Sequence, residues 1–282
     1  MDDTPQPPPS VGASGPSPGG STADPLTGIA RISLLAGLAP LIPLPFVDDW
    51  AEAMVRRRAV ADLLRERGLD PTPGDVAILA GLEGDRRTGC VQRVVVWTVM
   101  KLPLYLLKKI FRKVIYVLAI HDGVNAASSL FHDAYLLRHA LAGGVLDAAP
   151  GGRVDREAAR RVRRAVEATV AETDTQPLRR VIRTSFAGSN QTLAAGAEVL
   201  GRAARGTRAG AGDDGEAQAR AAEALPLEEE ERLLAPLIDR LAAAFFAQAG
   251  YRQALERRLE AHLETHLAGE TPPPPPPAAG FQ

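Results

Sequence analysis

Three histidines, two of them followed by an aspartate, are the residues whose types and spacing come closest to a metal or phosphohydrolase site. If their segment is helical, His121, His132 and His139 fall on one face, because offsets of 11 and 18 residues return to nearly the same angle. At a rise of about 1.5 Å per residue, however, neighbouring histidines lie about 16 Å and about 10 Å apart. Ligands of one metal lie about 2 Å from the ion, so at most one of these histidines could join any given site. The spacing therefore predicts a polar stripe on a helix.

A second pair, His262 and His266 in the sequence HLETH, has the i,i+4 spacing with which one helix can bind a metal. The zinc-protease form of this motif requires a glutamate directly after the first histidine, and Leu263 stands there instead. The sequence indicates no third ligand. A solvated helix face is the better interpretation.

The arginines at 160–164 could bind a phosphate, but Asp155, Glu157 and Glu167 lie close by and favour a salt-bridged surface. The glycine-rich stretches lack the order of a phosphate-binding loop, and the serines lack the context of a hydrolase nucleophile. Cys90 is the only cysteine, which excludes a disulfide framework and a zinc ligand set. The sequence thus indicates no catalytic residue, metal, cofactor or small-molecule substrate, and an enzyme is the least supported class of function.

The elements that must position these residues are predicted to be helices. Hydrophobic residues make up 45% of the 282 residues, but alanine and leucine dominate them, and aromatic residues reach only 5%. Ala, Leu, Arg and Glu favour helix, so the composition predicts an all-α fold, a multi-helix bundle of amphipathic helices. Pro103 divides one long segment into two helices or a single kinked rod. We expect helices at 27–39, 48–67, 74–83, 89–102, 103–120, 124–141, 154–172, 177–185, 190–205, 227–248 and 251–267.

Proline, glycine and charge patterns predict four parts of the chain. Residues 1–24 and 270–282 are rich in proline and are predicted to be a disordered tail and a polyproline tail. Between them we predict two domains, separated by a glycine-rich stretch. Residues 25–148 form an apolar and basic helical domain, which we expect to associate with membranes. Residues 153–269 form a charged helical domain with a flexible linker at 206–216.

An apolar segment at 25–47 opens the first domain. Ile32 to Val47 is uncharged but shorter than the roughly 20 residues that a straight spanning helix needs. Three prolines between positions 40 and 45 also prevent a regular helix in its second half. We expect a helix followed by an extended apolar turn, which is either buried in the protein or dips into a bilayer.

The stretch from Arg86 to His121 carries eight basic residues and no acidic one, and all four lysines of the chain lie within it. At 100° per residue, basic and aromatic residues share one sector of the expected helices, and aliphatic residues lie opposite. An apolar, basic segment with Trp and Tyr suits the surface of an anionic membrane. The residues predicted to bind this surface are Arg93, Trp97, Lys101, Tyr105, Lys108, Lys109, Arg112, Lys113 and Tyr116.

Two functions from different classes are compatible with these patterns. The first is a non-catalytic protein that associates with the cytoplasmic membrane surface, with anionic lipid as its partner. The alternative is a soluble all-α interaction or scaffold module with a protein partner, in which the basic helices pair with the chain's own acidic C-terminal helices. Nucleic acid is a weaker candidate partner, because so much of the basic segment is aliphatic.

Residues 33–80 resemble bacterial EcsC-like membrane-associated helical proteins. The similarity lies in a proline-clustered apolar segment, LAGLAPLIPLPFVDD, then a helix with basic residues that ends at Gly68, and the turn DPTPGD. An aromatic residue usually precedes that glycine in the family, whereas this chain has Arg67. The family offers no established catalytic residues to transfer. The resemblance implies a bacterial protein on the cytoplasmic side of the inner membrane, and the absence of a secretory signal pattern at the N-terminus leaves the cytoplasm as the other predicted location.

Overall fold

All regular elements that the structure describes are helices, which confirms the predicted all-α fold. The computed structural model describes residues 25–42, 47–83, 112–146, 153–211, 217, 220–221 and 228–268. The tails predicted to be disordered lie outside these residues. The elements are α1 (Pro25–Leu38), the 3-10 helix η1 (Ala39–Leu41), α2 (Val47–Glu66), α3 (Pro73–Leu79), α5 (Arg112–Ala142), α6 (Arg156–Ala171), α7 (Gln176–Ala187), α8 (Asn190–Ala211), α10 (Glu228–Phe246) and α11 (Ala249–Ala268).

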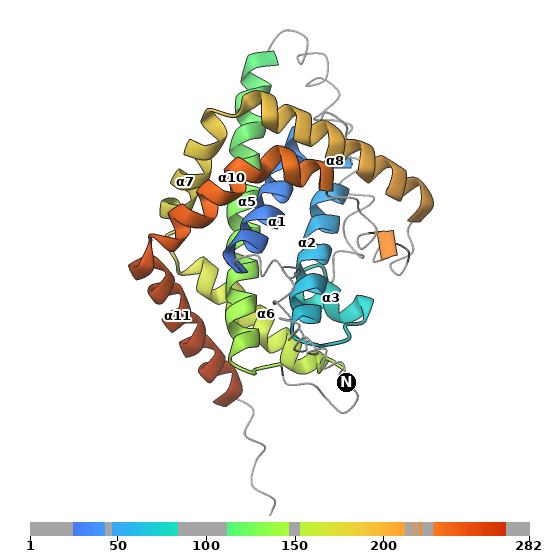
Figure 1. Ribbon diagram of the computed structural model, residues 1–282. Coiled ribbons are helices and arrows are strands. Elements are labelled where there is room, and N and C mark those ends of the chain that lie inside the picture. Colours follow the sequence, from blue (N-terminus) through green and yellow to red (C-terminus); the bar gives the residue numbers. More distant parts are fainter. Residues whose placement is uncertain are drawn as a thin grey trace, which may run out of the picture.

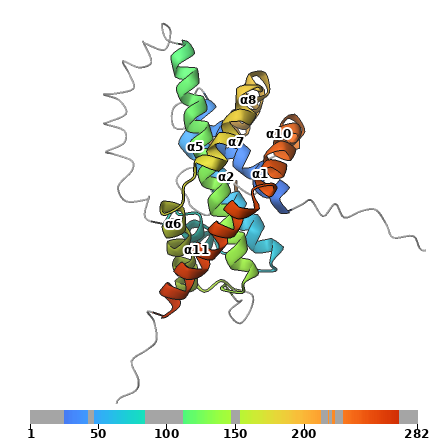
Figure 2. The same ribbon diagram turned by 90° about the vertical axis from the view of Figure 1, so that its left-hand side faces the viewer.

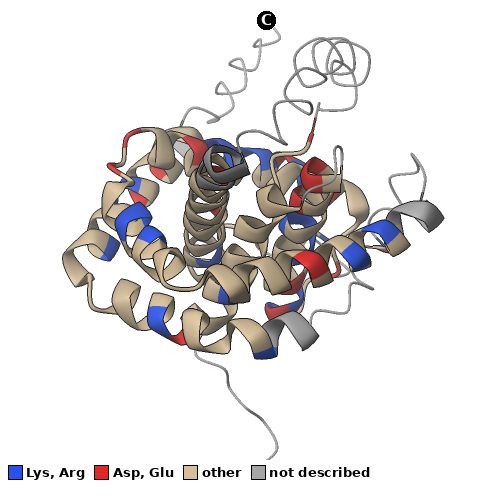
Figure 3. Ribbon diagram, turned by 90° about the horizontal axis from the view of Figure 1, so that it is seen from above, with Lys and Arg blue, Asp and Glu red and all other residues tan. Residues whose placement is uncertain are grey.

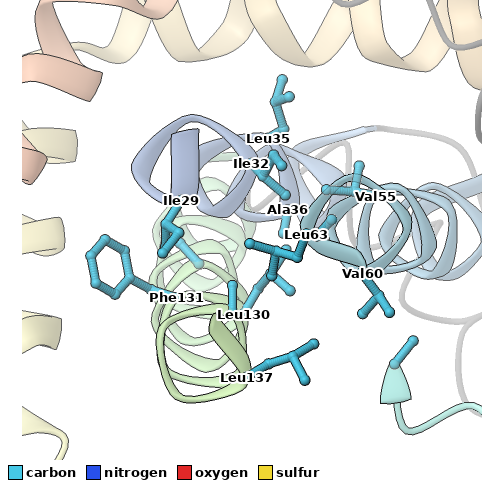
Figure 4. Close-up of a cluster of buried hydrophobic side chains, with 14 of the residues drawn as sticks. Ile29, Ile32, Leu35, Ala36, Val55, Val60, Leu63, Leu130, Phe131 and Leu137 are labelled. Atoms are coloured by element: carbon cyan, nitrogen blue, oxygen red, sulfur yellow. The ribbon is translucent and has the colours of Figure 1, made fainter. Parts of the chain in front are cut away.

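Helix α1 is the centre of the molecule. It packs most extensively against α5 and then against α10, with α2 beside it (Figure 1). Its residues Leu34, Leu35 and Leu38 are fully buried, and burial of one such side chain contributes about 1.5–3 kcal/mol. Figure 4 shows the packing where α1, α2 and α5 come together. Of the two environments expected for the segment 25–47, the protein interior is therefore the one found up to Ile42, which is also buried.

Helix α5 is one continuous element of 31 residues, about 46 Å long at 1.5 Å per residue. The sequence pattern instead predicted two helices here, at 103–120 and 124–141, with Gly123 between them. The structure corrects this, because Gly123 serves the packing of two helices. A Cβ atom added at Gly37 of α1 would lie 2.9 Å from the carbonyl oxygen of Gly123, and a Cβ at Gly123 would clash with the Gly37 oxygen. The two glycines let the backbones of α1 and α5 cross in contact.

The core is continuous across the predicted domain boundary at 149–152. One cluster of buried side chains contains Leu34 and Leu137 from the first predicted domain together with Ile182 and Phe245 from the second. Helix α1 packs against α10, and α5 packs against both α6 and α7. The two predicted segments therefore share one core rather than each burying its own.

The flexible linker predicted at 206–216 is wrong over its first six residues, because α8 continues as a helix to Ala211. The apolar side of α8, including Leu193 and Leu200, is buried as far as Ala204. Beyond that point the helix continues through its own backbone hydrogen bonds, since adding a residue to an existing helix is far easier than starting one. Residues 212–216 lie outside the described part of the chain.

The connection from α2 to α3 follows the local signals in the sequence. Gly68 has a φ of 71°, and the amide of Leu69 donates to the carbonyl of Leu64 at 3.1 Å, which closes the end of α2 as predicted. Thr72 and Asp75 then form a capping box at the start of α3. Asp48 and Asp49 lie in the first turn of α2, where their negative charge interacts favourably with the positive end of the helix dipole.

In the parts of the chain that the structure describes, no single helix has the length and apolar character needed to cross a membrane. Among the described helices, only α10 and α11 taken together meet that test, and they are bent by 75° relative to each other. Their apolar residues Leu241, Phe245 and Leu259 are fully buried in the core. The apolar side chains of α10 and α11 therefore pack in the interior of the protein.

Candidate anion-binding surfaces

The structure places only part of the predicted membrane-binding set. Six of its members lie outside the described residues: Arg93, Trp97, Lys101, Tyr105, Lys108 and Lys109. Arg112, Lys113 and Tyr116 lie on the first two turns of α5. These turns rise above the neighbouring helices at one end of the molecule (Figures 1 and 2).

The exposure of α5 changes sharply along its length. Leu118 is 55% exposed, and His121 and Asp122 are exposed as well. From Gly123 onward the helix enters the core, where Val124 is buried. The crossing with α1 therefore marks the point at which α5 leaves the body of the protein. Leu118 is one of three large apolar side chains that are exposed in the described residues.

Basic and acidic residues are interspersed over the helices that the structure describes, as the view from above shows (Figure 3). The arginines at 160–164 illustrate this. Arg160 donates to both carboxylate oxygens of Glu83, at 3.1 and 2.7 Å, and its hydrogen bond lowers the pKa of Glu83. Arg163 contacts Glu167 at 2.7 Å. The predicted salt-bridged surface is therefore confirmed here.

Asp133 is the centre of an ion-pair network that joins three helices. Its Oδ2 accepts from Arg56 of α2 at 3.1 Å and from Arg163 of α6 at 3.2 Å. Arg56 also donates to Ser129 of α5. The three charged side chains are only 13–16% exposed, so removal of the aspartate would leave two nearly buried cations without their shared partner. The network is structural, because both hydrogen bonds that Asp133 accepts here join α5 to another helix.

The predicted polar stripe of histidines is wrong for its middle member. His121 is exposed and His139 half-buried, but His132 is fully buried. Its Nδ1 lies 2.7 Å from the carbonyl oxygen of Ser128, which can only accept, so Nδ1 donates. Nε2 then accepts from the hydroxyl of Tyr251 on α11 at 2.6 Å. The sequence carried no sign of this pairing, because its two residues are 119 positions apart.

Two further polar pairs run along the same contact of α5 with α11. The hydroxyl of Tyr135 donates to Glu256, and His139 Nε2 lies 3.1 Å from Glu260. Burial raises the pKa of Tyr251 to about 12, and burial together with Glu256 raises that of Tyr135. Both hydroxyls therefore stay protonated at neutral pH and act as donors that fix α11 on α5.

We predict that folding stability falls as the pH drops below about 6.5 because of His132, by at most about 1.4 kcal/mol per pH unit. Burial lowers the pKa of His132, an effect that Arg179 reinforces and that Ser128 and Asp133 oppose. The unfolded chain, with an ordinary histidine pKa of about 6.5, therefore takes up the proton first as the pH falls. Stability is fully present above that value and is lost as the pH drops toward the lower pKa of the folded state. Urea unfolding at a series of pH values between about 7 and 5 measures this change in the free energy of unfolding.

The matching variant is His132→Gln, which carries no titrating group at this position. It should be less stable at pH 7 but should lose the pH dependence assigned to His132. His139→Gln serves as the control, because its side chain is 32% exposed on the same helix. If His132→Gln retained the wild-type slope, the acid sensitivity would belong to other groups.

A cleft of about 460 Å³ lies between α1, α2 and α5. Ile29 and Ile32 of α1 and Leu63 of α2 contribute apolar lining, and Figure 4 shows them where the three helices meet. The charged residues that line the cleft are Arg31, Arg58, Arg65, Arg138, Asp62 and Glu66. They come from three helices separated in sequence, so only the packing of those helices could reveal them.

Asp62 fixes part of the charged lining. Its Oδ2 accepts from Arg58 Nε at 2.8 Å, and its Oδ1 lies 3.7 Å from Arg65 Nη1. Among the described residues that line the cleft, four arginines accompany two carboxylates. The described lining therefore places guanidinium groups beside apolar side chains.

In the described ranges, no three His, Cys, Asp or Glu side chains lie close enough together to bind a metal ion. Of the HLETH pair, His262 instead contacts Glu172 of the neighbouring turn after α6 at 3.2 Å. This histidine thus contributes to the packing of α11 on α6.

Compared with known proteins, the chain matches no family model, no curated protein and no solved structure. The resemblance of residues 33–80 to EcsC-like proteins accordingly stays a prediction.

Proposed function

We propose that this protein associates peripherally with an anionic membrane surface through its basic segment 86–121. The observation that carries the proposal is the end of α5 that projects from the helical body, with Leu118 exposed on it. Arg112 and Lys113 lie on the same turns and continue the stretch that contains all four lysines. An apolar side chain next to basic ones is the combination that inserts at a lipid interface.

The proposed membrane contact is limited to the segment 86–121. The sequence made both 25–47 and 86–121 candidates for membrane contact, but the first segment is buried in the protein core up to Ile42. The contact is therefore interfacial, and depends on charge together with a few apolar side chains. The resemblance to bacterial EcsC-like proteins adds the cytoplasmic face of the inner membrane as the proposed location.

Flotation of the full chain with lipid vesicles tests the proposal. We expect binding to vesicles that contain an anionic lipid, and little binding to purely zwitterionic vesicles of the same size. Each Lys or Arg near an anionic surface contributes about 1 kcal/mol. Raising the salt from about 0.1 M to about 1 M should release the protein, since the Debye length falls from about 10 Å to about 3 Å.

Equal recovery with anionic and zwitterionic vesicles, or a protein that stays in the soluble fraction, would contradict the proposal. The alternative of a soluble interaction module would then gain support. Its predicted pairing of basic helices with acidic C-terminal helices stays a prediction, because Lys101, Lys108 and Lys109 lie outside the described residues. Two acids of α11, Glu256 and Glu260, instead contact Tyr135 and His139 of α5.

A further inference from the structure

We propose that the cleft between α1, α2 and α5 binds a phosphate monoester that carries a short alkyl chain. The proposal goes beyond membrane association, because the cleft is formed by α1, α2 and the buried half of α5, away from the projecting turns. Its volume of about 460 Å³ falls within the range of about 300–1,000 Å³ typical of ligand sites.

The guanidinium of Arg138 points to an anion. Arg138 lines the cleft and is half-buried, yet it forms no ion pair or hydrogen bond with any other described residue. A partly desolvated guanidinium normally has a carboxylate or phosphate partner, because its planar donors match the oxygens of such groups. Asp62 does not serve Arg138, since its two oxygens face Arg58 and Arg65.

A phosphate monoester suits the guanidinium of Arg138, because phosphate oxygens match the planar donors of that group. The lining also includes Ile29, Ile32 and Leu63, which would contact an apolar chain attached to the phosphate. An alkyl phosphate satisfies both parts of the cleft, whereas inorganic phosphate satisfies only one.

Isothermal titration of the full chain with octyl phosphate, below the concentration at which it forms micelles, tests the proposal. Octyl glucoside supplies the same chain without charge, and inorganic phosphate supplies the charge without the chain. We expect octyl phosphate to bind at one site and at least about tenfold more tightly than either control, because a hydrogen bond to a charged group and a buried chain each contribute about 1.4 kcal/mol or more.

Two variants locate the binding site. Arg138→Gln removes the proposed anion partner, and Gly28→Leu fills the cleft without changing its charge. Gly28 lines the cleft, and a Cβ atom there would meet no other atom within 4 Å, so α1 should keep its packing. Each variant should weaken octyl phosphate binding by about tenfold or more. Arg183→Gln, at an exposed arginine of α7, should bind like the wild type.

Absence of binding, equal binding of octyl glucoside, or unchanged affinity in both Arg138→Gln and Gly28→Leu would overturn the proposal. Binding of inorganic phosphate as tight as that of octyl phosphate would also overturn it, since the source would then be a free phosphate. Melting curves identify a variant that fails to fold, in which case the other variant decides. No vesicle enters this experiment, so its result is independent of the flotation assay.

Discussion

Replacing Lys108, Lys109, Arg112 and Lys113 together by glutamine is expected to weaken binding to anionic vesicles by roughly a hundredfold or more. Each basic side chain near an anionic surface contributes about 1 kcal/mol, and every 1.4 kcal/mol is a factor of about ten. On the proposed function these side chains face lipid, and exposed charges add only about 0–1 kcal/mol to folding. Co-sedimentation with vesicles measures the binding, and thermal melting should show nearly unchanged stability.

A charge-matched control is available in four exposed arginines from other parts of the chain: Arg67, Arg153, Arg240 and Arg257. Their joint replacement by glutamine removes the same charge, so it separates a local contact from a general effect of net charge. It should lower vesicle binding far less than the first variant does. If both variants lost binding equally, the basic segment would not be the membrane contact. If the first variant unfolded, its basic side chains would be structural partners of the acidic helices, and the membrane proposal would lose its main support.

The second large effect is expected from Gly123→Ala, which should destabilise the fold by about 3 kcal/mol. A Cβ atom at this position would clash with the backbone oxygen of Gly37, and neither helix can move without disturbing the core around Leu34 and Phe131. Insertion of atoms into a packed interior costs about 1–3 kcal/mol, and here the obstacle is backbone rather than a flexible side chain. The free energy of unfolding in urea measures this change.

Gly206→Ala is the matched control, because Gly206 also lies within a helix but a Cβ there meets no atom within 4 Å. Alanine is favoured over glycine in a helix by about 0.8–1.0 kcal/mol, so this variant should be slightly more stable than the wild type. A Gly123→Ala protein as stable as the wild type would show that α1 and α5 do not cross in backbone contact. The crossing also fixes the base of the projecting turns, so Gly123→Ala should lower vesicle binding as well.

Features that depend on neighbouring residues could be predicted from the sequence. The apolar spacing in 124–141 puts Val124, Leu130 and Leu137 on one face of a helix, and these side chains are at most 3% exposed. The end of α2 followed from Gly68, whose backbone adopts the left-handed conformation that glycine reaches without strain. Helix propensity and apolar spacing are local properties, so composition was sufficient to predict an all-α fold.

Which helices meet, and therefore which contacts an individual residue makes, depends on tertiary packing. An apolar segment suits a protein core and a bilayer equally well, so the central position of α1 depended on its contacts with α5 and α10. Gly123 lies between two helices predicted from the sequence. Its close approach to Gly37, which only the packed structure shows, explains why a glycine occurs within a continuous helix. Likewise His132 and Arg138 lie on one helix, yet packing buries the first against Tyr251 and places the second in the cleft. Such contacts join residues far apart in the chain, and their energies depend on how helices cross, which no local pattern of residues specifies.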